Sequence, residues 1–427
     1  MDLLRSWCKN VLWFMQKYPK IFSALLFLVF LTYRHQTKFG PVYQKAPKSY
    51  PNIEKQLTPE NTKCDIDKQL EQSREVCDQL FSALKLSTDV AEKSYSEKLS
   101  RGCSLEDAIE NCSALKAALL FGKKRIQADE TGFPLAFAIK IHRDENQAFR
   151  LLRYIYRTHN VYCIHVDAKA SHRIFDAFKR IQACTNNVFV IDDPVDVVYS
   201  SIRQVEAELK CMKLMKMTSV SWKYYINLTG QEFMLKSNAE IIHYLRKLNG
   251  TNDIESYPLP ENHLYRIGQV HTIQNGKIVK TSKKKEHFRL KLNIRKGSAY
   301  GLFSREFVNY LLNHPTVKLL KAWLEDTYAP EELVWATINA LADAPGGDVN
   351  ERTYANGKFQ CRAVKWRTDA SIKCHGKYVH DVCIYGVKDL LWLLQSDFLI
   401  ANKFYEEFEA AALTCLETAM YSRLLQS

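Results

Sequence analysis

The fold class can be predicted from three consecutive segments, PLAFAIKIH at residues 134–142, DENQAFRLLRYIY at residues 144–156 and VYCIHVD at residues 161–167. The first and third segments are short apolar runs, which favour buried strands. The segment between them repeats its apolar residues at the spacing of one helix face. A strand, a helix and a second strand in this order predict two parallel strands joined by a crossover helix.

The same alternation continues further along the chain. A helix is expected after Ser171 and another over residues 200–217, with strands at VFVID, residues 188–192, and YYINLTG, residues 224–230. Repeated strand-helix units predict an α/β fold with a mostly parallel sheet and helices on both of its faces.

Polar residues follow the first two predicted strands. His142 and Asp167 stand at the carboxyl ends of neighbouring strands, where open α/β sheets collect ligands. A structural hydrogen bond is the ordinary role of one such residue, but two of them on adjacent strands favour a binding site. The sequence has no GxGxxG segment and no Walker loop, so a dinucleotide or P-loop site is not predicted.

The composition is that of a packed globular protein, since 46% of the 427 residues are hydrophobic and 25% are charged. The formal net charge of +13 suits an anionic partner such as a nucleic acid, an acidic membrane surface or a nucleotide diphosphate. No segment combines dense Lys and Arg with interleaved aromatic residues, and the basic run at residues 283–285 is expected to lie in a solvated loop. Nucleic acid is therefore not an expected partner.

An uncharged apolar run, IFSALLFLVFLTY at residues 21–33, follows the cations Arg5, Lys9, Lys17 and Lys20. This pattern predicts an uncleaved signal anchor, because positive charge stays on the cytosolic side and no small-residue cleavage site follows the run. The short span favours a thin membrane of the secretory pathway, and a single-pass type II protein of the Golgi is expected. The expected organisation is a cytosolic tail at residues 1–20, a transmembrane segment at 21–33, a lumenal, partly ordered stem at 34–132 and a catalytic domain at 133–427.

A lumenal location would place most of the twelve cysteines in disulfides. The chain has no CxxC pair and no Cys/His cluster with zinc spacing, so no metal site is predicted. Acceptor motifs for N-glycosylation occur at Asn111, Asn227 and Asn249. Asn227 falls in a predicted buried strand, so only Asn111 and Asn249 are expected to be modified.

Seven motifs occur in the order of one enzyme family. They are YCIHVDAKA (162–170), VVYSSIRQVEAELKCMK (197–213), WKYYINLTGQEF (222–233), GSAY (297–300), EDTYAPEELVWATI (325–338), RAVKW (362–366) and IANKF (400–404). Over residues 133–416 the chain resembles the β1,6-N-acetylglucosaminyltransferases of glycosyltransferase family 14, the core 2 and I-branching enzymes. The resemblance implies a glycosyltransferase-A type, Rossmann-like α/β domain.

Inverting sugar transfer needs a base that takes the proton of the attacking acceptor hydroxyl. Four acids lie close together in EDTYAPEELVWATI, namely Glu325, Asp326, Glu331 and Glu332. Residue type alone does not rank them, and capping or surface roles would be ordinary for each. The resemblance implies that Glu332 is the base.

For the nucleotide-sugar donor, UDP-GlcNAc, the resemblance implies contacts after the first two strands and near the C-terminus. The implied donor-binding residues are Ile141, His142, Arg143, Asp167, Ala168, Lys169, Tyr199, His380 and Lys403. Family 14 enzymes neutralise the leaving diphosphate with basic side chains, so no metal cofactor is expected. The Asp-x-Asp triplet at residues 65–67 lies in the predicted stem.

His380 departs from the family pattern, which usually has Arg at this position. A guanidinium is always charged, whereas imidazole titrates near neutral pH. We therefore expect donor turnover to rise as the pH falls through the range of the secretory lumen. Some I-branching members share a His here.

On the acceptor side the resemblance points to Glu255, Arg266 and Trp366, which match residues that hold the acceptor disaccharide in core 2 enzymes. His263 lies between Glu255 and Arg266, at a position where Lys is usual. Further departures from the family pattern are Thr368 for Tyr, Thr229 for Cys, Glu232 for Asp and Met234 for Pro.

The resemblance also implies disulfides. They are Cys112–Cys184, Cys163–Cys211, Cys374–Cys383 and a fourth that ends at Cys415. For the partner of Cys415, Cys77 fits the family context better than Cys64. The remaining Cys64, Cys103 and Cys361 could pair locally or link two chains into a homodimer.

The leading interpretation is a core 2 type transferase that moves GlcNAc from UDP-GlcNAc to the 6-hydroxyl of GalNAc in Galβ1,3GalNAc on Ser or Thr of glycoproteins. Glu255 and Arg266 favour it. I-branching of poly-N-acetyllactosamine is the alternative that His380 favours. A catalytically silent family member acting as a lectin or chaperone also stays open, although the presence of Glu332 and Lys403 argues against it.

Overall fold

The computed structural model describes residues 64–86, 103–120 and 128–426, together with Tyr95, Glu97 and Leu99. These residues belong to one compact unit, Asn61–Ser427, which includes helices from the region predicted as stem. The predicted anchor at residues 21–33 lies outside the described residues. Among the helices of the described part of the chain, none is long and apolar enough to cross a membrane.

A six-stranded mixed sheet forms the centre of the unit, in the order β3-β2-β1-β4-β11-β6. Its strands are β1 (Leu135–Ile141), β2 (Val161–Val166), β3 (Val188–Val190), β4 (Tyr224–Thr229), β6 (Asp253–Ile254) and β11 (Gly301–Ser304). Neighbours among β3, β2, β1 and β4 pair in parallel, whereas β11 is antiparallel to both β4 and β6. The prediction of an α/β fold with a mostly parallel sheet is confirmed.

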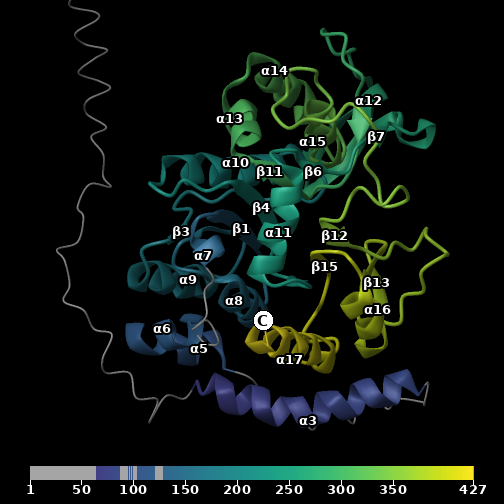
Figure 1. Cartoon of the computed structure of the whole chain (residues 1–427). Helices are drawn as coiled ribbons and strands as arrows, with labels where there is room; N and C mark the ends of the chain where they lie inside the picture. Colours follow the sequence, from purple (N-terminus) through teal and green to yellow (C-terminus); the bar gives the residue numbers. More distant parts are fainter. Residues whose placement is uncertain are drawn as a thin grey trace, which may run out of the picture. The chain divides into compact units, whose positions relative to one another are not determined.

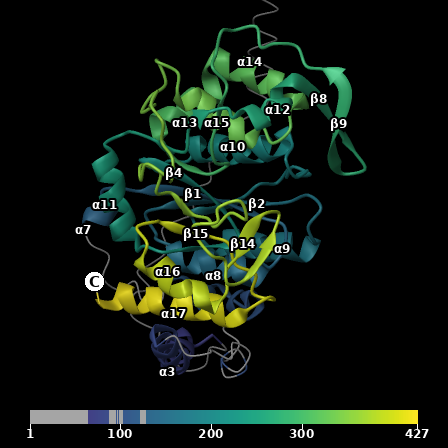
Figure 2. The same ribbon diagram turned by 90° about the vertical axis from the view of Figure 1, so that its right-hand side faces the viewer.

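Helices cover both faces of this sheet (Figures 1 and 2). On one face lie α8 (Glu145–Ile155), α9 (His172–Cys184), α11 (Asn238–Leu248) and α17 (Ala410–Gln426), and on the other α10 (Ile202–Met217), α13 (Arg305–Asn313), α14 (Pro315–Trp323) and α15 (Glu331–Asn339). Phe137 and Ile139 belong to the first core, and Ala136 and Ala138 to the second. Successive side chains of a strand point to opposite faces, so β1 is buried on both sides, as its unbroken apolar run predicts.

Disulfides tie the N-terminal helices to this core. α3 (Ile66–Lys85) contacts α17 and is linked to it by Cys77–Cys415 (Figure 1). α6 (Cys112–Leu120) is linked to α9 by Cys112–Cys184 and also contacts α5 (Leu105–Ala108), whereas α7 (Ala128–Thr131) contacts α11. The helices that precede the sheet are therefore part of the folded unit.

The other cysteines of the described residues are also assigned. Cys163–Cys211 joins β2 to α10, and Cys374–Cys383 lies in the C-terminal region, so the pairs implied by the resemblance are present in the structure. Cys64 pairs with Cys103, which leaves Cys77 as the partner of Cys415, and Cys361 is buried and free.

Small sheets and short helices surround the central sheet. The sheets pair β5 (Glu232–Met234) and β12 (Arg362–Ala363) with β15 (Ile400–Asn402), β7 (Tyr257–Pro258) with β10 (Arg295–Lys296), β8 (Gln269–Gln274) with β9 (Lys277–Lys284), and β13 (Lys377–Val379) with β14 (Val382–Ile384). The short helices are η1 (Glu261–His263), α12 (Tyr265–Gly268), η2 (Leu324–Asp326), η3 (Val387–Asp389) and α16 (Leu390–Gln395).

The prediction of a solvated loop at residues 283–285 is wrong. Asn275 and Gly276, with φ of 49° and 71°, form a tight turn of the kind that joins two antiparallel strands, and β9 extends to Lys284. Lys285 is buried and bonded to Asp326, with its ammonium group 4.5 Å from the centre of the Trp323 ring. The long stem of a lysine can pack on an aromatic ring while its charge is paired, so a basic run need not be solvated along its whole length.

Exposure separates the three asparagines of the glycosylation motifs. Asn111 and Asn249 are exposed, whereas Asn227 is fully buried in β4, where its amide nitrogen donates to the carbonyl of Ala299 at 3.0 Å. Because the modifying enzyme must reach the amide nitrogen, we expect N-glycans at Asn111 and Asn249 when the chain is made in the secretory pathway. Mass spectrometry before and after deglycosylation should show one glycan lost in Asn111→Gln and one in Asn249→Gln. A glycan attached to Asn227 would contradict the buried position of this residue.

Candidate active site

The carboxyl ends of β1 and β2 meet at one edge of the sheet, as the sequence predicts. The backbone N–H of Asp167 donates to the carbonyl of Ile141 at 2.7 Å, which places Asp167 beside His142. The Asp167 carboxylate accepts from the backbone of Lys169 at 2.9 Å, and Ala168 donates to Val195 at 3.2 Å. Burial and the charge of the adjacent Arg143 lower the pKa of His142, so this imidazole is held in its neutral form.

Three cations surround the ring of Tyr405. Arg143 follows β1, Lys377 begins β13 and Lys403 follows β15, and their charged groups lie 4.9, 5.8 and 5.3 Å from the ring centre. Arg143 pairs with Asp144 at 2.7 Å and with Glu407, but neither lysine forms an ion pair with a described residue. Burial lowers the pKa of Lys403, and the charge of Arg143 adds to this, while Glu232 opposes it. The cluster can therefore bind an anion. The negative charge of a bound anion would stabilise the charged form of Lys403, which burial and Arg143 disfavour.

A buried carboxylate holds the strand that precedes Lys403. Glu232 in β5 is fully buried, and its Oε1 accepts from Arg362 at 2.8 Å and from Asn402 at 2.7 Å. Its Oε2 accepts from the backbone of Thr229 at 2.8 Å. Both oxygens are thus satisfied, and the two departures from the family pattern, Thr229 and Glu232, bond to one another. Glu232 thereby fixes Asn402, the residue that immediately precedes Lys403.

His380 occupies the tip of the β13–β14 hairpin. It forms a two-residue turn with Asp381, and both residues have positive φ, 50° and 60°, as the turn type that matches strand twist requires. The His380 ring centre lies 4.8 Å from that of Tyr199. The hairpin therefore brings a C-terminal residue to the loop before α10, and the structure places two predicted donor-binding residues together.

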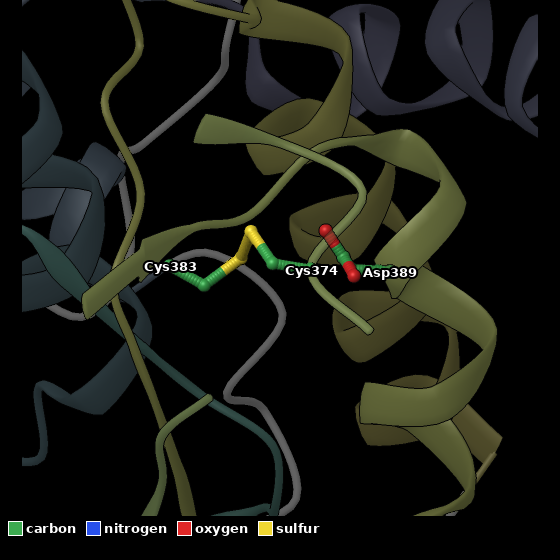
Figure 3. A group of neighbouring side chains, drawn as sticks. All are labelled: Cys374, Cys383 and Asp389. Carbon is green, nitrogen blue, oxygen red and sulfur yellow. A yellow bond between two sulfur atoms is a disulfide. The ribbon is translucent and has the colours of Figure 1, made fainter. Parts of the chain in front are cut away.

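The base of this hairpin is held by a disulfide and a buried carboxylate (Figure 3). The Asp389 carboxylate accepts from Lys365 Nζ at 2.7 Å and from the backbone of Gly386 at 3.0 Å, beside Cys374–Cys383. Among the described residues, Cys374, Cys383 and Asp389 form the one group with the spacing of metal ligands. Because the two sulfurs are bonded to each other and the carboxylate is already bonded, this group is structural.

Glu332 is the second residue of α15, and one of its carboxylate oxygens is fixed by two cations. Its Oε2 accepts from Arg266 Nη1 at 2.6 Å and pairs with Lys296 Nζ at 3.3 Å. Its Oε1 has no hydrogen-bond donor among the residues that the structure describes. Burial raises the pKa of Glu332, but Lys296 and Arg266 outweigh it, so the pKa lies below the usual value. The result is an ionised carboxylate with one oxygen available.

A glycine allows the segment between β6 and β7, which contains Glu255, to approach this helix. The backbone N–H of Gly297 donates to the carbonyl of Glu332 at 2.8 Å, and a Cβ at Gly297 would lie 1.7 Å from the carbonyl oxygen of Glu255. Only glycine fits such a close approach. Burial raises the pKa of Glu255 to about 7, while Lys296 opposes this shift and Glu332 adds to it. Glu255, Lys296 and Glu332 therefore form one electrostatically coupled group.

Glu331, the neighbour of Glu332, has a different environment. It is buried, and its Oε1 accepts from Gln204 in α10 at 2.8 Å. Burial and the charge of Glu332 raise its pKa to about 8, so Glu331 is mostly protonated at neutral pH. Of the two adjacent glutamates, Glu332 is the one that is ionised and can accept a proton.

The acceptor-side residues of the sequence analysis are only partly brought together. The Nδ1 of His263 and the Nε of Arg266 are buried without a hydrogen-bond partner among the described residues, so both could bond ligand hydroxyls. Trp366 lies instead beside the His380 hairpin, in a β-bridge with Val382. Within the described part of the chain, no hydrogen bond, ion pair or ring contact joins Trp366 to Glu255, His263 or Arg266.

Two cations of this site were not predicted from the sequence. Lys296 contacts Glu332, and Lys377 joins the cluster around Tyr405. Lys296 stands directly before the motif GSAY, and Lys377 stands three residues before His380. Their position near a motif or a predicted site residue was the available signal, but only the pairing of β7 with β10 and of β13 with β14 brings them to the site.

Comparisons of the sequence with known proteins identify one family. Residues 135–394 match the family model described as Core-2/I-Branching enzyme. The chain is similar to the human beta-1,3-galactosyl-O-glycosyl-glycoprotein beta-1,6-N-acetylglucosaminyltransferase, with 36% identity over 327 residues, 74% of this chain and 76% of that protein. It is 37% identical over 306 residues to the human N-acetyllactosaminide beta-1,6-N-acetylglucosaminyl-transferase, covering 70% and 75% of the two chains. A probable beta-1,3-galactosyl-O-glycosyl-glycoprotein beta-1,6-N-acetylglucosaminyltransferase 7 of Sus scrofa is 37% identical over 317 residues, 72% of each chain.

Proposed function

The chain belongs to the Core-2/I-Branching enzyme family of glycosyltransferases, and from this premise we propose that it transfers GlcNAc from UDP-GlcNAc in β1,6 linkage to the GalNAc of Galβ1,3GalNAc on Ser or Thr. The observation that carries the proposal is the state of Glu332, whose Oε2 is fixed by Arg266 and Lys296 while Oε1 stays available. A fixed, ionised carboxylate with one free oxygen is suited to accept a proton from a sugar hydroxyl.

The proposed step is a single displacement with inversion. Glu332 Oε1 takes the proton of the 6-hydroxyl of GalNAc as its oxygen bonds to the anomeric carbon of GlcNAc. The bond from that carbon to the diphosphate breaks on the opposite face, and UDP leaves with the bonding electron pair. Arg266 holds Glu332 in place, and its Nε, together with Nδ1 of His263, offers unused polar groups to acceptor hydroxyls.

We propose that side chains, rather than a metal ion, neutralise the departing diphosphate. Lys403, Arg143 and Lys377 gather around Tyr405 at the carboxyl end of β1, and two of the three have no carboxylate partner among the described residues. Charge-assisted hydrogen bonds from such groups can stabilise a leaving phosphate. His380 and Tyr199 would then lie on the side of the donor that faces α10.

We further propose that the enzyme is a single-pass type II protein of the Golgi membrane with its catalytic domain in the lumen. The apolar run at residues 21–33 and its basic flank support this orientation. Disulfides such as Cys77–Cys415 suit an oxidising compartment.

Transfer to poly-N-acetyllactosamine is the second candidate, because one relative at 37% identity has N-acetyllactosaminide in its name and because His380 departs from the core 2 pattern. The two candidates differ only in the acceptor. One assay with both acceptors therefore separates them.

The test is transfer of labelled GlcNAc from UDP-GlcNAc by the full chain, in the presence of EDTA, to a core 1 disaccharide and to a lactosamine acceptor. We expect transfer to core 1 at a rate unchanged by EDTA. Faster transfer to lactosamine would assign the chain to I-branching. Loss of activity in EDTA that is restored by a divalent cation would contradict the metal-free mechanism, and no transfer to either acceptor by folded protein would favour a silent lectin.

A further inference from the structure

The segment that contains β9 is a basic surface whose charge is not compensated. Its exposed cations lie on both faces of the β8–β9 hairpin, since Lys277 and Lys280 are an odd number of residues apart in β9, and in the segment that follows β9. They are Lys277, Lys280, Lys283, Lys284, Arg289 and Lys291, and we call this set the basic surface. None of the six forms an ion pair with a described residue, and Glu286 is the one acid within residues 277–295. Single exposed lysines without a partner, such as Lys116 and Lys213, occur elsewhere on the described part of the chain, but here six unpaired cations share one segment. Such a concentration attracts anionic partners.

Apolar side chains are exposed among these cations. Ile273 and Val279 lie on the two strands and on opposite faces of the hairpin, and they are 37% and 39% exposed. Leu264 and Tyr265, beside the hairpin, are 48% and 39% exposed. Figure 2 shows the β8–β9 hairpin projecting from the body of the unit next to α12. A surface that combines unpaired cations with exposed aliphatic groups fits a partner that is both acidic and partly apolar.

A groove of about 540 Å³ continues this surface. It is lined by residues that include Pro258, Leu264, Ile267, Phe288, Arg295 and Trp323. The ring centres of Phe288 and Trp323, two of these lining residues, lie 5.3 Å apart. The groove can take apolar side chains of an extended ligand.

A two-stranded wall separates the groove from the proposed base. β7 and β10 pair with Pro258 opposite Arg295 and Tyr257 opposite Lys296. Pro258 and Arg295 line the groove, whereas Lys296 pairs with Glu332 at 3.3 Å. A ligand in the groove therefore lies one residue along the strand from a side chain that contacts Glu332.

We propose that the basic surface and the groove dock an acidic, partly apolar segment of the acceptor's own polypeptide. This inference rests on the proposed function, in which the reacting GalNAc is bonded directly to Ser or Thr. The polypeptide then necessarily runs within one sugar ring of the reaction centre, which favours peptide over a membrane surface as the occupant. Acidic side chains meet the lysines, and neighbouring apolar side chains enter the groove. The enzyme is thereby selective for glycoproteins whose glycosylation sites are followed or preceded by acidic residues.

The test compares three forms of one core 1 acceptor with the full chain. The disaccharide is presented on a peptide with Asp, Glu and Leu around the glycosylated Thr, on the same peptide with Asn and Gln in place of the acids, and as a benzyl glycoside without peptide. We expect KM for the acidic glycopeptide to be about tenfold below that of the neutral one, since four exposed charge pairs together suffice for that factor. The preference should fade as salt is added.

Replacing lysines of the basic surface then tests whether they cause the preference for the acidic glycopeptide. In the variant K277Q/K280Q/K283Q/K284Q we expect the preference to disappear, while kcat and the KM of the benzyl glycoside stay unchanged. The matched control removes four other exposed lysines that form no ion pair with a described residue, in K116Q/K213Q/K247Q/K318Q, and should keep the preference. An equal loss in both variants, or an undiminished preference in the first, would overturn the proposal.

A binding measurement separates this proposal from the proposed function. If the wild-type chain transferred to none of the three acceptors, the proposed function would fail, and fluorescence anisotropy of the labelled, unglycosylated acidic peptide would decide the docking alone. Binding that is lost in the first variant and kept in the control supports the docking surface. Equal binding by both variants, or binding of phosphatidylserine vesicles without binding of the peptide, overturns it.

Discussion

Glu332→Gln is expected to lower kcat for GlcNAc transfer by about 10³-fold, the scale of a lost general base. The carboxylate is ionised because Lys296 and Arg266 outweigh the effect of burial on its pKa. Gln has nearly the same shape and can still accept from Arg266, so the variant removes the basic oxygen and leaves the packing in place. KM for UDP-GlcNAc should change little, because the donor-side cations lie around Tyr405.

Glu331→Gln is the matched control, since it changes the adjacent residue in the same way. The pKa of Glu331 is raised to about 8 by burial and by Glu332, so the wild-type side chain is already mostly neutral at neutral pH. Its replacement by a neutral amide affects chiefly the hydrogen bond from Gln204, worth about 1 kcal/mol or roughly a fivefold change in rate at most. Initial rates at saturating donor and acceptor, with thermal unfolding to verify the fold, give the comparison. Equal losses in the two variants would show that Glu332 has no special role.

The central sheet was predictable because its signals are local. Four strands and the three helices between them follow from apolar runs and helical spacing, and their observed bounds lie within a few residues of the predicted ones. The β8–β9 hairpin was missed, although Asn275-Gly276 between two extended segments is a hairpin signal. The density of lysines there made a solvated loop the more natural interpretation.

The site was less predictable because its geometry depends on contacts between distant segments. Lys296 reaches Glu332 only through the pairing of β10 with β7 and the close approach at Gly297. Glu232 looked like an isolated departure from the family pattern, yet it bonds Thr229 at the end of β4 as well as Arg362 and Asn402, which the sheet of β5, β12 and β15 brings to it. Residue type does not rank Glu332 above Glu331, and only the resemblance pointed to Glu332, whereas burial and charge in the fold separate their pKa values.

Lys403→Ala is expected to lower kcat/KM by about 10²-fold or more, the cost of losing a group that stabilises transition-state charge. Lys403 is the cation that Glu232, through Asn402, holds in position, and it forms no ion pair with any described residue. The charge of Lys403 is therefore available to the diphosphate of a bound donor. Lys358→Ala, at an exposed lysine of the same C-terminal region, is the control and should leave kcat/KM unchanged.

The pH dependence of kcat/KM for UDP-GlcNAc provides a second test of Lys403. Burial and Arg143 lower its pKa from 10.5, although Glu232 opposes them, so its charge is lost as the pH rises through a value below that of an ordinary lysine. We expect kcat/KM for UDP-GlcNAc to fall on the alkaline side in the wild type. In Lys403→Arg, whose guanidinium does not titrate in this range, that alkaline decline should move to higher pH even if the absolute rate is reduced. An identical decline in the two proteins would assign the titrating group elsewhere, because the substitution changes the pKa at this one position while keeping the charge.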